Sequence, residues 1–329
     1  MKESESLTRT AGLERAILGA VPTYTAADVA AQSGVSLDEA RRLWRALGFP
    51  ETGGDTAFTS ADTEAVSRIF AMVESGLIDF DLAVTITRAV GQTMARLADW
   101  ETTALLHRVE EMTQGEADTP QGRLAAAMRI FEEFSGSFEE LLVYVWRRHL
   151  AASVARVEAL SAREEDLHTT QLTVGFADIV SFTALSNQLS EDRIGDLVEL
   201  FESRCADVVA NQRGRVIKSI GDSVLFVNDD PIAAYDTAAG IINVIGRDPR
   251  MPDVRVGLAS GLVVMRLGDV FGPPVNMAAR LTAVARRNRI IIDARTAELL
   301  PDDQFETRRL PARPVRGFGL VEPVSVRRS

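Results

Sequence analysis

Apolar residues recur at three- and four-residue intervals through most of the first half of the chain, a spacing that predicts amphipathic helices. This pattern runs from Leu7 to about Gln114 and includes a long helical stretch over 69–97. Thr25 is a candidate cap for one short helix, and the turn at Gly34–Ser36 precedes the next. We therefore predict an all-helical N-terminal domain, residues 1–136.

A helical pattern over 124–134 leads into a second run, 138–165, that contains neither Pro nor Gly. This run is long enough to connect two domains, and we assign residues 137–168 to a linker helix. Its apolar positions mix three- and four-residue steps; they are Leu141, Leu142, Val145, Leu150, Val154, Val157 and Leu160. That spacing suits a helix that pairs with a copy of itself, and it equally suits an amphipathic helix packed on its own domain.

After Thr169 the pattern changes to short apolar strands that alternate with helices. The predicted order is strand 171–177, helix 191–211, strands 215–220 and 223–227, helix 232–245, strands 254–259 and 262–267, and helix 274–285. This β-α-β-β-α-β order is the ferredoxin-like pattern, extended by later strands near Ile290 and Val324. The chain is therefore predicted to be an α+β protein whose second domain spans 169–329, although this fold alone defines no function.

The amino-acid composition excludes several classes of protein. The chain has 329 residues with 46% hydrophobic and 25% charged residues, which is typical of a folded globular protein with two domains. Apolar runs such as 141–146 are far shorter than the roughly 18 residues of a spanning helix, and residues 1–20 lack a signal-peptide pattern. We therefore expect a cytoplasmic protein without a membrane span. One cysteine, Cys205, and three histidines exclude an internal disulfide and a Cys/His zinc site.

The net charge of -11 is unevenly distributed along the chain. Residues 1–166 hold 16 Lys or Arg against 27 Asp or Glu, whereas residues 167–329 hold 20 of each. An acidic domain repels phosphate backbones, so a nucleic-acid partner is not expected. Only two of the 36 basic residues are lysines, Lys2 and Lys218, so an interior lysine is an unusual choice for this chain.

The segment 24–49 has the spacing of a helix-turn-helix with arginines on its second helix, and it somewhat resembles the head of MerR-type regulators. A DNA-binding, nucleotide-responsive regulator is therefore the alternative function from another class. The competing interpretation is a helical hairpin whose Leu43, Trp44 and Leu47 pack inward. The acidity of the surrounding sequence favours the hairpin.

Two carboxylates are placed where they could meet at one edge of the predicted sheet. Asp178 ends the first strand, and Asp222 lies in the Gly-Asp turn between the next two strands. Paired hard oxygen ligands suit Mg²⁺, although an Asp in such a turn often serves only the turn. A helix beginning within Ile179–Thr183 would offer free backbone N–H groups to phosphate oxygens. Together these parts predict a site for a metal and a triphosphate.

Three segments carry a family resemblance. Residues 176–183 (FADIVSFT), 218–222 (KSIGD) and 268–280 (GDVFGPPVNMAAR) resemble, in this order and spacing, the signature segments of the class III nucleotidyl cyclases. The resemblance covers residues from about 170 to 326 and implies that family's catalytic fold. Ser181 stands where many members have Gly.

The resemblance implies a metal and phosphate site in the first two segments. Asp178 and Asp222 match the family's two metal-binding aspartates, with the carbonyl of Ile179 as a further ligand, for two Mg²⁺ or Mn²⁺ ions per site. Phe182 and Thr183 match positions that contact the substrate.

The same resemblance implies the groups that bind the rest of an ATP substrate. Lys218 and Asp269 match the pair that recognises adenine. They supply a hydrogen-bond donor and an acceptor, whereas guanine requires the opposite donor and acceptor pattern. Asn276 and Arg280 match the catalytic pair that orients ribose and stabilises the transition state, and Arg255 matches a phosphate-binding arginine. The implied enzyme is an adenylate cyclase that forms cyclic AMP and pyrophosphate. A catalytically dead scaffold is disfavoured because no motif position is substituted.

The family builds each site from two catalytic domains, and this chain carries both halves. The resemblance therefore implies a head-to-tail homodimer with two shared sites. The helical half looks like that of the soluble mycobacterial-type cyclases, in which it restrains the catalytic domain. Its histidines His107, His149 and His168 are candidate proton sensors. A diguanylate cyclase is disfavoured because the Gly-Gly-Asp sequence at 53–55 lies in the helical half.

Overall fold

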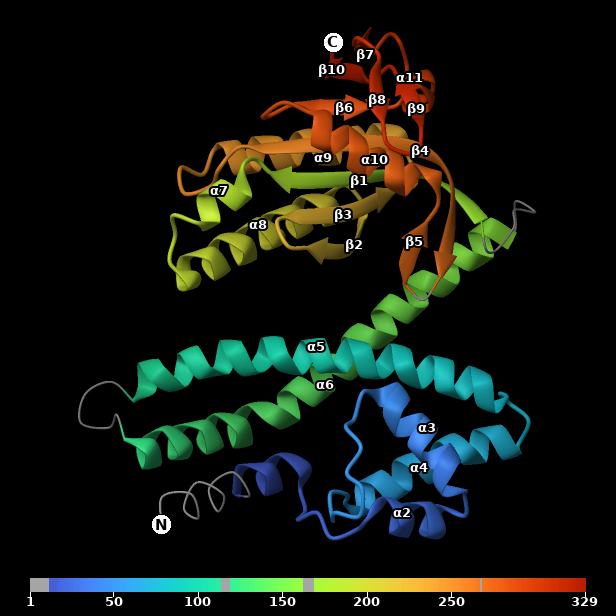
Figure 1. The fold of residues 1–329 in the computed structure, drawn as a ribbon, viewed down its shortest axis with the longest axis vertical. Coiled ribbons are helices and arrows are strands. Elements are labelled where there is room, and N and C mark those ends of the chain that lie inside the picture. The colour runs from blue at the N-terminus through green and yellow to red at the C-terminus, as the bar shows by residue number, and fades with distance from the viewer. Residues whose placement is uncertain (1–11, 114–118, 162–168, 267) are drawn as a thin grey trace. The chain divides into compact units, whose positions relative to one another are not determined.

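The computed structural model in Figure 1 describes residues 12–113, 119–161, 169–266 and 268–329. The chain divides into two compact units, Met1–Ala151 and Ala152–Ser329. The first unit is helical and the second contains a mixed sheet covered by helices, so the predicted fold class is confirmed. Within the described ranges, no helix combines the length and the hydrophobicity needed to cross a bilayer.

Local capping signals start the helices of the first unit. The helices are α2 (Ala26–Ser33), α3 (Leu37–Leu47), α4 (Ser60–Glu74), α5 (Phe80–Met112) and α6 (Pro120–Ser161), the last of which continues into the second unit. The predicted cap at Thr25 is confirmed, because its side chain accepts a hydrogen bond from the backbone of Asp28 while the Asp28 carboxylate accepts one from the backbone of Thr25. Ser36 and Glu39 form the same reciprocal pair before α3.

Two predicted helix boundaries in this part of the chain are wrong. The stretch over 69–97 is interrupted, since α4 ends at Glu74, Gly76 adopts a left-handed φ of 72°, and Asp79 caps α5. In contrast, the helix predicted from 138 begins at Pro120 and passes through Gly136, because an isolated glycine costs a helix only about 1 kcal/mol. The predicted end of the helix, beyond residue 161, lies outside the described residues.

The segment 24–49 folds as a packed helical hairpin. Leu43 and Trp44 are buried, and the Trp44 ring stacks on Phe58 with ring centroids 4.4 Å apart. Leu47 packs against the same cluster. Two of the arginines on α3 are ion-paired with carboxylates, which removes part of the charge that a DNA contact would use. The predicted inward packing of Leu43, Trp44 and Leu47 is therefore confirmed.

The second unit is built on one sheet with strand order β2-β3-β1-β4-β6-β10-β7, and β5 pairs with β4. Its strands are β1 (Thr169–Ile179), β2 (Arg215–Ile220), β3 (Ser223–Asn228), β4 (Val254–Arg266), β5 (Asp269–Phe271), β6 (Ile290–Ile292), β7 (Phe305–Arg309) and β10 (Val324–Arg328). A separate hairpin joins β8 (Arg313–Val315) to β9 (Gly319–Val321). The helices are α7 (Phe182–Ser186), α8 (Glu191–Asn211), α9 (Pro231–Gly246), α10 (Pro273–Val284) and α11 (Ala294–Leu299).

Helices cover both faces of this sheet. Alternate residues of β1 point to opposite faces, so Ala177 and Ile179 pack in the core with α8 and α9, whereas Leu172 and Val174 pack in the core with α10. Because of this alternation, Asp178 lies on the face that α10 covers.

The prediction of two strands over 254–259 and 262–267 is wrong, because β4 is one strand as far as Arg266. Ser260 and Gly261, which lie between the two predicted strands, are part of β4. Instead β1 pairs with β4 at every residue from Thr169, opposite Val264, to Ile179, opposite Val254. This continuous antiparallel ladder outweighs the local preference of the two small residues.

A glycine sets the distance between β4 and α10. A Cβ atom at Gly257 would lie 2.4 Å from the backbone nitrogen of Thr282 and 2.5 Å from the carbonyl oxygen of Ala278. The helix backbone therefore rests directly on the strand at this point. That contact positions Asn276 and Arg280, which α10 also carries.

We predict that Gly257→Ala lowers the free energy of unfolding by about 1–3 kcal/mol, because the added methyl group overpacks this contact. Gly195→Ala is the matched control, since Gly195 lies in α8 with open space around its Cβ position. The control should raise stability by up to about 1 kcal/mol through helix propensity. The free energies of unfolding of both variants are measured by urea denaturation. If the Gly257 variant is as stable as the unaltered chain, the close contact between β4 and α10 is contradicted.

Candidate active site

Asp178 is held between two neighbouring strands. Its register partners are Ser223 on β3 and Arg255 on β4. The Ser223 hydroxyl donates to Asp178 Oδ1, and Arg255 Nε donates to Oδ2 at 2.7 Å. Arg255 Nη2 lies 2.6 Å from the same oxygen. The carboxylate is therefore oriented by strands that flank it on both sides.

Asp222 lies beside this carboxylate at the same edge of the sheet. Its backbone carbonyl accepts a hydrogen bond from the N–H of Ile179 at 3.1 Å, and Gly221 before it has a left-handed φ of 61°. Partial burial, followed by the negative charge of Asp178, raises the pKa of the Asp222 carboxyl. The structure thus brings the two predicted aspartates together, and their mutual repulsion favours a cation between them.

The donor set fits a divalent cation that binds with a polyphosphate. Among the residues that the structure describes, no three His, Cys, Asp or Glu side chains gather closely enough to hold a metal ion. Asp178 and Asp222 are two carboxylates, and Mg²⁺ is commonly held by one or two carboxylates while waters and substrate phosphates complete its shell. The edge therefore suits Mg²⁺ or Mn²⁺ with a nucleotide.

A second group of predicted residues meets elsewhere on the sheet. Lys218 on β2 and Asp269 at the start of β5 form an ion pair although 51 residues separate them. Their side chains are 37% and 26% exposed, and Asp269 Oδ1 also accepts the backbone N–H of Val270 at 2.9 Å. The pair is accessible and offers one cationic donor beside one anionic acceptor.

Asn276 and Arg280 are four residues apart on α10, so both lie on one helical face. Both residues are exposed. Neither side chain has a hydrogen-bond or ion-pair partner within the described part of the chain. Their polar groups are therefore available to a ligand.

The short helix α7 begins at Phe182, within the predicted range Ile179–Thr183. Ser181 caps it with a φ of 59° and a ψ of 30°, a left-handed conformation that explains why glycine suits this position. The Phe182 side chain packs against the core on the α8 and α9 face, whereas Thr183 is exposed. Phe182 can therefore contact a phosphate through its backbone but not through its side chain.

Ser223 was missed by the sequence reasoning. It follows Asp222 directly, and it could have been found by extending the antiparallel register of the predicted hairpin to the first strand. Arg255 was expected to bind phosphate, and in this structure it binds Asp178.

Both halves of the chain match known protein families. Residues 165–324 match the family described as the adenylate and guanylate cyclase catalytic domain, and residues 8–150 match the adenylate cyclase regulatory domain. An adenylate cyclase of Streptomyces coelicolor is 39% identical over 94% of this chain and 87% of its own length. The chain therefore belongs to the adenylate and guanylate cyclase family, as an adenylate cyclase with a regulatory domain before the catalytic one.

Two further proteins are similar to this chain. A Mycobacterium tuberculosis protein named a pH-sensitive adenylate cyclase is 30% identical over 95% of this chain and 81% of its own length. The catalytic core of a rhodopsin-guanylyl cyclase with converted specificity, solved with ATPαS, is 25% identical. That similarity covers 49% of this chain and 98% of the other, with a TM-score of 0.46.

We predict that Asp222→Asn raises the melting temperature at neutral pH in metal-free buffer by roughly 1–2 °C, a small effect because the carboxyl is only partly buried. The pKa of Asp222 is higher in the folded state than in the unfolded state. Its contribution to the free energy of unfolding is therefore fully present at low pH and is lost as the pH rises through the folded-state pKa. The gain should therefore shrink on acidification. Thermal unfolding across pH measures it, with exposed Asp303→Asn as the control, and a pH-independent gain would contradict the assignment.

Proposed function

We propose that this chain converts ATP to 3',5'-cyclic AMP and pyrophosphate at sites shared between two copies. The observation that supports this most is the division of the candidate residues into two groups. Asp178 and Asp222 form an acidic edge, and the Lys218–Asp269 pair lies apart from it on the same sheet. No hydrogen bond or ion pair between described residues joins the side chains of these two groups.

The Lys218–Asp269 pair provides the recognition of the base. The Asp269 carboxylate accepts a hydrogen bond from the 6-amino group of adenine, and the Lys218 ammonium donates to a ring nitrogen. Guanine presents a carbonyl where adenine has the amino group, so it leaves both groups mismatched. The existing ion pair holds the two side chains in place before the base arrives.

The chemical step needs groups at the ribose and the α-phosphate. The ribose 3'-oxygen attacks the α-phosphorus in line, its proton leaves, and the bond from that phosphorus to pyrophosphate breaks. Asn276 orients the ribose, and the planar guanidinium of Arg280 binds the phosphoryl oxygens on which charge grows. Both side chains are exposed and unpaired among the described residues, as this role requires.

The acidic edge provides the other half of the site. Asp178, the Ile179 carbonyl and Asp222 would hold two Mg²⁺ or Mn²⁺ ions, whose chemistry when bound is to acidify the 3'-hydroxyl and neutralise the phosphates. Arg255 exchanges Asp178 for a substrate phosphate, which frees the carboxylate oxygen that it now contacts. The backbone N–H groups of Phe182 and Thr183 bind terminal phosphate oxygens.

A homodimer is supported by apolar side chains around the base-recognition pair. Five large hydrophobic residues on β2, β4 and β5 are 39–63% exposed: Val216, Ile220, Leu262, Val264 and Phe271. Clustered exposed apolar residues of this kind mark protein interfaces. A head-to-tail pairing would cover them. It would also place the acidic edge of one copy against the Lys218–Asp269 pair of the other.

We further propose that residues 1–136, through the linker 137–168, regulate this dimer, with protons as a candidate signal. The match to the regulatory domain and the pH-sensitive relative support this. His107 is exposed and 3.7 Å from Glu111, so its protonation would create an ion pair. His168 lies outside the described residues. An unchanged pH profile of activity in a His107→Ala, His149→Ala variant would remove these histidines as sensors.

Shared sites predict that two inactive variants restore each other's activity. Asp178→Ala and Arg280→Ala should each abolish cyclic AMP formation, because each removes a group from a different half of every site. Mixing them in equal amounts should recover about a quarter of the activity of the unaltered protein, since half of the dimers are mixed and each mixed dimer has one intact site. Cyclic AMP production from ATP with Mg²⁺ or Mn²⁺ is the measurement.

The matched control is a mixture of Asp178→Ala with Asp222→Ala. Both defects lie in the same half-site, so every site in every dimer stays defective and no activity should return. Absence of recovery in the first mixture, with mixed dimers shown to form, would mean that each chain builds its own site.

A further inference from the structure

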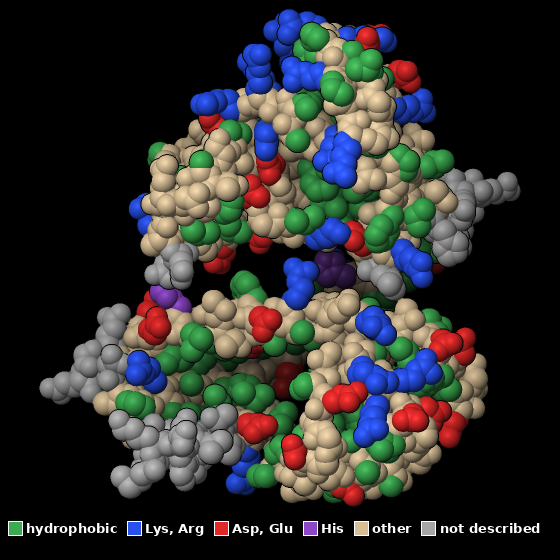
Figure 2. Space-filling view, viewed as in Figure 1, with side chains coloured by type: hydrophobic (Ala, Val, Ile, Leu, Met, Phe, Trp, Pro, Cys, Tyr) green, Lys and Arg blue, Asp and Glu red, His purple; other side chains and the backbone are tan. Residues whose placement is uncertain are grey.

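A hollow of about 710 Å³ lies in the second unit beyond the C-terminal end of α10. The last residue of the helix, Val284, lines the hollow together with residues of β6, β7, β8 and β10. Ile291 and Leu310 pack beneath the helix end and form an apolar floor. Figure 2 shows Lys and Arg side chains gathered over the end of the unit that carries β7 and β10 in Figure 1.

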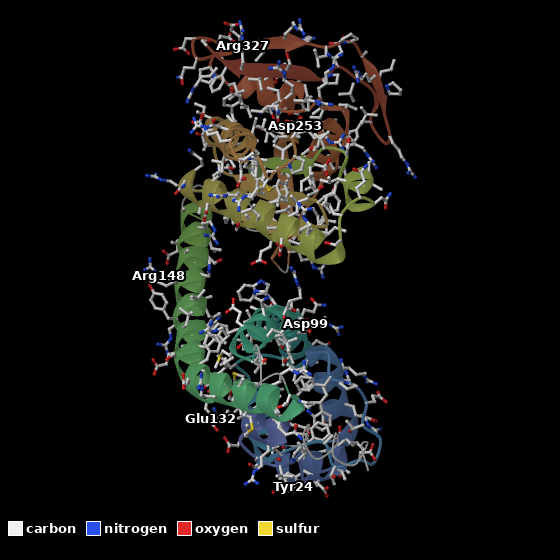
Figure 3. The ribbon with its side chains drawn as sticks, turned by 90° about the vertical axis from the view of Figure 1, so that its left-hand side faces the viewer. Tyr24, Asp99, Glu132, Arg148, Asp253 and Arg327 are labelled. Carbon is white, nitrogen blue, oxygen red and sulfur yellow. The ribbon has the colours of Figure 1, made fainter. Side chains whose placement is uncertain are left out.

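Strand register directs arginines into this hollow. Ser325 on β10 pairs with Ile291 on one side and with Arg308 on the other, so these three residues share a face. Arg289 precedes Ile291 by two positions and shares its face as well. Arg327, labelled in Figure 3, pairs with Glu306 on the same side.

The hollow concentrates positive charge with little compensation. Its lining contains the arginines Arg286, Arg289, Arg308, Arg313 and Arg327. Its lining carboxylate is Glu306, which accepts from Arg327 Nε at 2.8 Å. The other four arginines have no carboxylate partner among the described residues.

Two neighbouring arginines that do not line the hollow are neutralised by carboxylates. Arg287 pairs with Asp253, labelled in Figure 3, at 3.6 Å, and Arg309 pairs with Glu322 at 3.2 Å. The adjacent residues, Arg286 and Arg308, line the hollow without such partners. Residues 167–329 hold 20 acidic residues against 20 basic ones, so acidic residues are available in this half of the chain, yet those that the structure describes do not pair with these arginines.

We propose that this arginine pocket binds a small polyphosphate anion. Its volume lies in the range of small-ligand sites, and guanidinium groups converging from several strands can each bind two oxygens of a phosphate. A bound anion would also relieve the repulsion between the arginines. The proposal rests on this charge and shape and not on the proposed activity.

The polyphosphate has two possible sources. The pocket begins one helical turn beyond Arg280, because Val284 lies four residues after it on α10. Pyrophosphate released at the proposed active site is therefore one source, and a triphosphate chain supplied from solution is the other. Both present the same chemistry to the arginines.

Binding of pyrophosphate and tripolyphosphate to the full chain, measured by calorimetry in EDTA, tests the proposal. Arg289→Gln with Arg308→Gln should weaken binding by about tenfold or more through loss of charged hydrogen bonds. The matched control is Arg287→Gln with Arg309→Gln, which removes the same charge from neighbouring positions outside the pocket. It should change the dissociation constant by less than about twofold, and circular dichroism confirms that both variants are folded.

Equal binding by the pocket variant and the unaltered chain would overturn the proposal. An equal loss in both double variants would also overturn it, because general charge would then explain the binding. Loss only in a Lys218→Gln, Arg280→Gln variant would place the anion at the candidate active site instead. If the pocket variant alone loses affinity, tighter binding of pyrophosphate than of tripolyphosphate identifies the product as the ligand, and the reverse order identifies a triphosphate.

Discussion

The antiparallel pairing of β1 with β4 is the interaction on which the second unit depends. It runs along the whole of β1 and places Arg255 opposite Asp178 at one end. The same pairing places Gly257 opposite Phe176, and the absence of a side chain at Gly257 lets α10 rest on the sheet. One ladder therefore fixes both the acidic edge and the helix that carries Asn276 and Arg280.

Two charged pairs of the candidate site are neutralised within the protein, whereas most arginines of the arginine pocket are not, within the described part of the chain. Asp178 is neutralised by Arg255, and Lys218 is neutralised by Asp269, so the protein itself holds these groups in position without a ligand. In the function that we propose, substrate binding would exchange these charged contacts within the protein for contacts with the substrate. In the pocket, four arginines lack carboxylate partners among the described residues, which is why an external anion is the expected partner there.

Sequence predicted the elements of the second unit better than their ends. Periodicity indicated its strands and helices, and the positions of Asp178 and Asp222 at strand ends indicated that they meet. The pairing of Lys218 with Asp269 came from the resemblance, because no local pattern relates residues 51 positions apart. The arginine pocket could not be foreseen, since it depends on the register of β6, β10 and β7. The domain boundaries remain a proposal, with the division between the units falling inside α6.

We propose that the acidic edge and the Lys218–Asp269 pair together give this chain its adenylate cyclase activity, and base selectivity is the direct test of that proposal. The measurement is kcat/KM for ATP and for GTP in the unaltered protein and in a Lys218→Glu, Asp269→Cys variant. We expect a strong preference for ATP that falls by about a hundredfold or more in the variant, because the donor and acceptor for adenine are replaced while the acidic edge remains. An unchanged ATP to GTP ratio in the variant would contradict the account.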